Sequence, residues 1–145
     1  MKIAAHVAVV ALLAFAGADG VEAQSLKVRQ RMVAQEKSLL KDVAISNKIC
    51  ESHFTVRFNW TALPQADLDK YSPESYCDNG LLLGIRQVCG NAAGKAAVKE
   101  KIKRMICGFG AERTISLKDG ELIYKINFNS SNDFDFVYDY LQHNL

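Results

Sequence analysis

The sequence lacks the short motifs by which many enzymes and metal sites are identified. It contains no Gly-x-Ser-x-Gly, His-Glu-x-x-His or glycine-rich phosphate loop, and it has only three histidines. No Cys-x-x-Cys pair is present, and the four cysteines follow one another at intervals of 27, 12 and 18 residues, which match no zinc ribbon or finger. We therefore predict no metal, no cofactor and no assignable catalytic residue, and we expect a protein that is not an enzyme.

Proline, long apolar runs and strong charge of one sign are also scarce. The only two prolines, Pro64 and Pro73, lie in one connecting region. A single long apolar run occurs, at the start of the chain, so we predict no transmembrane anchor in the remainder. The formal net charge is only +2, which is too small to indicate a nucleic-acid partner.

The start of the chain has the pattern of a secretory signal peptide. A lysine precedes an apolar run from Ile3 to Ala18, which is short for a bilayer span, and small residues follow it. We predict cleavage before Gln24, with cleavage after Ala18 as the alternative. Residues 1–23 are then the signal peptide and residues 24–145 a single domain, in a protein that is secreted or periplasmic.

Apolar periodicity predicts an α+β domain in that remainder. Helices are predicted over residues 26–46, 72–89, 91–107 and 130–145, and strands over residues 53–60, 114–117 and 122–128. Asp119-Gly120 indicates a tight hairpin turn that pairs Leu117 with Leu122. The order α-β-α-α-β-β-α is typical of a three-stranded antiparallel sheet covered on one face by helices.

The four cysteines are expected to form two disulfides, because an exported chain meets an oxidising compartment. Cys77 and Cys89 would lie about 18 Å apart along one helix, which excludes a bond between them. Antiparallel packing of the two middle helices favours Cys77 with Cys107, and this leaves Cys50 for Cys89.

Two sets of polar residues are candidates for binding. His53 and Arg57 fall on the polar face of the first predicted strand, where they could hold an anion. Lys95, Lys99 and Lys103 recur every four residues and would make one helix face basic, which suits an anionic partner. Both patterns are also typical of ordinary solvated surfaces.

Small size, export, disulfides and the lack of a catalytic motif favour a non-enzymatic binding protein that acts on another macromolecule. An inhibitor or an immunity-like protein of the cell envelope is one concrete form. The partner would be another protein or an anionic envelope component, and the protein itself a monomer or weak dimer. One alternative is a small hydrolase or lyase centred on His53, with Arg57 as anion clamp. The other is a carrier of an apolar ligand, which requires a cavity between helix and sheet.

Overall fold

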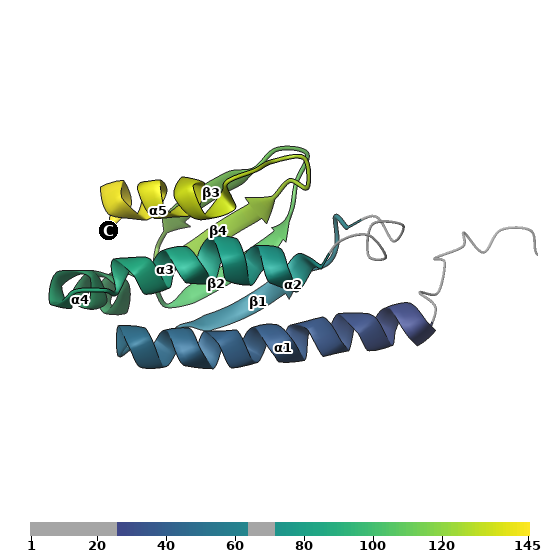
Figure 1. Ribbon diagram of the computed structural model, residues 1–145, viewed down its shortest axis with the longest axis horizontal. Coiled ribbons are helices and arrows are strands. Elements are labelled where there is room, and N and C mark those ends of the chain that lie inside the picture. Colours follow the sequence, from purple (N-terminus) through teal and green to yellow (C-terminus); the bar gives the residue numbers. More distant parts are fainter. Residues whose placement is uncertain (1–25, 64–71) are drawn as a thin grey trace, which may run out of the picture.

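The protein has an α+β fold in which helices cover one face of a four-stranded mixed sheet (Figure 1). The computed structural model describes residues 26–63 and 72–145. The strands are β1 (Thr55–Asn59), β2 (Arg104–Phe109), β3 (Thr114–Lys118) and β4 (Glu121–Ile126). The helices are α1 (Leu26–Cys50), α2 (Pro73–Tyr76), the π-helix η2 (Cys77–Leu82), α3 (Leu83–Val88), α4 (Ala92–Lys101) and α5 (Asp133–Asn144). The predicted signal peptide lies outside the described residues.

The sheet is not the three-stranded antiparallel one that the sequence predicts. Its order is β1-β2-β4-β3, with β2 parallel to both of its neighbours and only the β3–β4 pair antiparallel. The additional strand β2 comes from the end of the helix predicted over residues 91–107. That helix ends at Lys101, and Ile102 already has an extended backbone (φ −110°, ψ 116°). Because β2 is a central strand, its apolar residues follow one another without alternation, a pattern that does not distinguish a buried strand from a helix.

Strand β4 is the last strand in the chain but lies inside the sheet, between β2 and β3. The connection at residues 110–113 therefore carries the chain past the end of β4 before β3 begins. The Gly110 amide donates to the Ile126 carbonyl at 3.0 Å, and the Asn127 side-chain amide donates to the Ala111 carbonyl. These bonds fix the crossing connection to the end of the strand that it passes.

The hairpin between β3 and β4 forms as predicted. Leu117 pairs with Leu122, and the turn residues Asp119 and Gly120 have φ angles of 51° and 79°, as this two-residue turn requires. The outer edge of β3 is partly covered by α5, since the Leu117 amide donates to the Tyr140 hydroxyl at 2.7 Å. An edge amide is thereby satisfied within the protein.

The core lies between the sheet and the helix layer, in which the continuous helical segment formed by α2, η2 and α3 lies between α1 and α5 (Figure 1). This segment corresponds to the helix predicted over residues 72–89 and has a π-helical stretch in its middle. Helix α1 extends four residues beyond its predicted end near residue 46. Its buried residues are Leu39, Val43, Ser46 and Cys50, so only its C-terminal half contributes to the core. None of the described helices is long and apolar enough to span a membrane.

Both predicted disulfides, Cys50–Cys89 and Cys77–Cys107, are present. The geometric reason differs from the predicted one, because Cys107 lies on strand β2 and not on a helix. The Cys77–Cys107 bond therefore joins the helix layer to the sheet, and the Cys50–Cys89 bond joins the ends of α1 and α3. No cysteine is left free, which is consistent with an oxidising compartment.

Candidate binding surface

The structure separates His53 from the strand on which the sequence places it. Strand β1 begins at Thr55, and His53 lies exposed in the connection that follows α1. Arg57 does lie on β1, exposed on the sheet face opposite the helices. His53 and Arg57 therefore do not share one strand face, although both lie close to the start of β1.

Lys103 connects the end of α4, the helix that carries Lys95 and Lys99, to the start of β1. Because α4 ends at Lys101, Lys103 lies beyond the helix and does not continue its face. Its Nζ donates to the Lys99 carbonyl at 2.7 Å, and its own carbonyl accepts from the Thr55 amide at 3.2 Å. The backbone of one residue thus connects the basic end of α4 with the edge strand that carries Arg57.

Lys95 differs from the other candidate lysines because it has an acidic partner. Its Nζ lies 2.6 Å from the Glu51 Oε1, and this hydrogen bond lowers the pKa of Glu51. The pair lines a surface cleft of about 440 Å³ beside the Cys50–Cys89 disulfide, together with Lys99. The charge of Lys95 is largely balanced by this pair. Lys99 forms no salt bridge with a described carboxylate, although its charge also helps to lower the pKa of Glu51.

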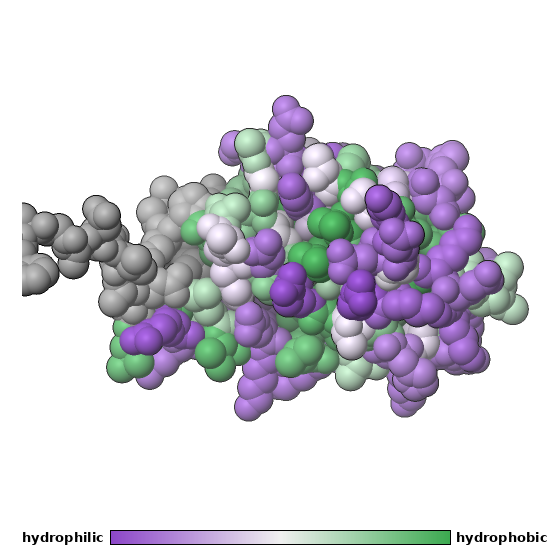
Figure 2. Space-filling model, turned by 180° about the vertical axis from the view of Figure 1, so that it is seen from behind, coloured by the Kyte–Doolittle hydropathy of each residue, from purple (hydrophilic) through white to green (hydrophobic). Residues whose placement is uncertain are grey.

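The open face of the sheet carries further basic residues that were not among the candidate binding residues. Its outward positions form three rows across the strands: Thr55, Arg104, Glu121 and Lys118; Arg57, Ile106, Ile123 and Ser116; Asn59, Gly108, Lys125 and Thr114. We call Arg57, Lys99, Lys103, Arg104, Lys118 and Lys125 the basic surface. Figure 2 shows hydrophilic side chains gathered over the end of the molecule that carries α4.

Most of the cations of the basic surface form no salt bridge within the part of the chain that the structure describes. Arg104 is the exception, since its Nε lies 3.2 Å from the Glu121 Oε2. The sequence does not place Arg104 on the sheet, because the pattern of its segment predicts a helix. Lys118 and Lys125 could have been found, because both alternate with the buried residues of the predicted hairpin.

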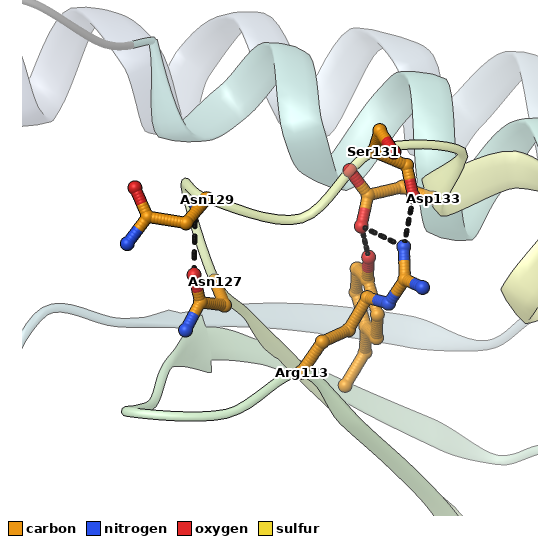
Figure 3. A network of polar contacts seen from close by, with 6 residues as sticks. Arg113, Asn127, Asn129, Ser131 and Asp133 are labelled. Carbon is orange, nitrogen blue, oxygen red and sulfur yellow. Dashed lines mark hydrogen bonds and ion pairs between the residues drawn. The ribbon is translucent and has the colours of Figure 1, made fainter.

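A second polar cluster is closed within the fold (Figure 3). The hydroxyl of the fully buried Tyr124 donates to Asp133, and the Arg113 Nη1 lies 3.3 Å from the same carboxylate oxygen. Arg113 also donates to the Ser131 carbonyl at 2.5 Å and stacks on the Phe136 ring at 4.2 Å. Burial and then the hydrogen bond to Asp133 raise the pKa of the Tyr124 phenol. The polar groups of this cluster bond to one another, so the cluster joins the start of β3 to β4 and α5.

A third cluster lies between α1 and the segment formed by α2, η2 and α3. Arg86 lies 2.9 Å from Asp78 and donates to the buried Ser46 hydroxyl at 3.2 Å. Burial, followed by the negative charges of Asp78 and Glu74, raises the pKa of Asp42. Among the described residues, no set of three His, Cys, Asp or Glu side chains is arranged to hold a metal ion.

No family model, curated protein or solved structure matches the chain.

Proposed function

We propose that the protein is an exported, non-catalytic domain that binds another macromolecule through its basic surface. The observation that carries this proposal is the concentration of unpaired positive charge. Five cations that form no salt bridge with a described carboxylate lie on the open sheet face and the adjoining end of α4: Arg57, Lys99, Lys103, Lys118 and Lys125. The whole chain has a formal net charge of only +2, so this surface is much more basic than the chain as a whole.

The shape of the surface supports a large partner over a small ligand. Small-molecule sites are concave and place a few polar groups toward one point. Here the cations project from a sheet face and a helix end, and Lys99 alone among the unpaired five lines the cleft beside α4. A protein or an anionic envelope component can contact such a spread of charge, as an inhibitor or immunity-like protein does with its target.

The two alternative functions, a hydrolase or lyase and a carrier of an apolar ligand, receive less support. A hydrolase or lyase centred on His53 needs a carboxylate or hydroxyl within hydrogen-bond reach. His53 is exposed in a loop, with no hydrogen bond to a described side chain. A carrier needs a cavity between helix and sheet, and the buried side chains of Phe54 and Tyr124 occupy that region.

The test uses charge reversal at three positions of the basic surface, Arg57→Glu, Lys99→Glu and Lys103→Glu, in one protein. The wild-type protein should recover a partner from native envelope extract. We expect the variant to recover about tenfold less of it, because like charges then face each other. The readout is quantitative mass spectrometry of the bound fraction. Recovery should also fall as salt is raised.

The matched control reverses three exposed lysines on α1, Lys27, Lys37 and Lys48, and should keep the partner. Equal recovery by the wild type, the control and the basic-surface variant would refute the proposal. Loss with both variants would show that net charge matters and the surface does not.

A further inference from the structure

We infer that the open sheet face docks an acidic segment of a partner protein, which places one apolar side chain on Ile106 and Ile123. This inference rests on the proposed function and specifies the partner. Ile106 pairs with Ile123 in the β2–β4 register, at the middle row of the outward face. Both side chains are half-buried, and neither belongs to the residues that pack against the core.

The two isoleucines lie on the side of the sheet opposite the helices. The fully buried strand residues, such as Met105, Leu122 and Tyr124, alternate with them and face the helix layer. No helix within residues 26–63 and 72–145 covers the other side (Figure 1). Figure 2 shows apolar side chains in the middle of this face and below it, with hydrophilic side chains on both sides.

The charges around the isoleucine pair indicate that the partner segment is acidic. Arg57 is the neighbour of Ile106 in the middle row, and Lys125 and Lys118 lie in the rows on either side of Ile123. Glu121 is the only acid among the twelve outward positions, and it is paired with Arg104. An apolar centre with a positive border is complementary to an apolar side chain flanked by carboxylates.

The residues at these outward positions argue against a nucleic acid or a membrane as the binding partner of this face. None of the twelve outward positions carries an aromatic side chain, so the face offers no ring on which a base could stack. Two β-branched side chains on a sheet also provide no protruding apolar group that could enter a bilayer. An acidic protein segment is the occupant that uses both the apolar centre and the cations.

The test titrates two synthetic peptides and one membrane probe into the full folded protein. In the first peptide, aspartate and glutamate flank one central leucine; in the second, alanine replaces the leucine. We expect the leucine peptide to bind about fivefold more tightly, through the apolar area it buries. Amide chemical shifts should change on β2 and β4. Vesicles of phosphatidylcholine and phosphatidylglycerol should not compete with the peptide.

The variant Ile106→Thr with Ile123→Thr should abolish the preference for leucine and keep the weaker binding of the alanine peptide. The control replaces Val33 and Leu40 of α1, which are 65% and 56% exposed, by threonine and should keep the preference. Equal affinity for both peptides, shifts confined to α1 or α5, or vesicle competition would overturn this inference. The charge-reversal result on the native partner would still stand in that case.

Discussion

Tyr124 is the residue at which the fold depends most clearly on one polar contact. Its ring is fully buried, and its hydroxyl reaches Asp133 beneath Gly80, where an added Cβ would lie 3.0 Å from the Asp133 Cβ and 3.4 Å from the Tyr124 hydroxyl. Arg113 bonds the same carboxylate. A buried hydroxyl or carboxylate without a partner is costly, so each member stabilises the others.

We predict that Tyr124→Phe lowers the free energy of unfolding by about 1–3 kcal/mol, because Asp133 loses a donor in a largely buried site. Denaturant unfolding at neutral pH measures this change. Tyr138→Phe is the matched control, since its ring stacks on Phe134 and no described hydrogen bond involves its hydroxyl.

The same pair of variants tests the pKa of Tyr124. Its folded-state pKa is raised above the ordinary value of 10.0, so the folded protein keeps the proton that the unfolded chain releases. The stability that this contributes is complete below pH 10.0 and is lost as pH rises above it. The free energy of unfolding of the wild type and of Tyr138→Phe should therefore include a contribution from Tyr124 that falls above pH 10.0. The free energy of unfolding of Tyr124→Phe should not include it. Parallel pH curves for all three proteins would contradict the assignment.

Among the elements, the β3–β4 hairpin is the one that the sequence predicts together with its register. Asp119-Gly120 selects the turn, and alternation on both sides selects the faces. Strand β2 could not be predicted in the same way, because Val98, Ile102 and Met105 have helical spacing although only Val98 lies in the helix. The local sequence pattern is enough to predict a hairpin. Whether a segment forms a central strand depends on neighbouring strands that are distant in sequence.

We predict that Gly120→Ala destabilises the protein by about 1–2 kcal/mol, since φ of 79° is unfavourable for a residue with a Cβ. The added Cβ would also lie 3.1 Å from the Lys103 side chain. Thermal unfolding measures the effect. Asp119→Asn serves as the control, because asparagine adopts positive φ readily, and a loss of stability as large as that of Gly120→Ala would argue against a backbone cause.

The candidate site was only partly accessible from the sequence for a related reason. The polar positions Arg57, Lys95 and Lys99 could be named from alternation and helical spacing. Their spatial relation could not, because it depends on α4 ending at Lys101 and on β2 entering the sheet beside β1. The isoleucine pair of the open face could not be predicted for the same reason, since the pattern of residues 91–107 indicates a helix that includes Ile106.

At the scale of the whole molecule, the two disulfides hold the helix layer and the sheet in one unit. They close loops with sequence separations of 39 and 30 residues. Replacing either pair of cysteines by alanine should lower the free energy of unfolding by about 3–4 kcal/mol, through the greater freedom of the unfolded chain. Chemical denaturation of the two double variants measures this. Midpoints equal to that of the wild type would contradict a stabilising role.

The position of β4 has a consequence for the order in which the chain can fold. Since β4 separates β2 from β3, a ribosome-bound chain that ends before Glu121 leaves β3 with no hydrogen-bonded neighbour and β2 with β1 alone. The sheet closes only when almost the whole polypeptide has been synthesised. If the chain is exported during synthesis, in line with the proposed function, a translocation channel that accepts unstructured polypeptide would meet it before the native sheet could form.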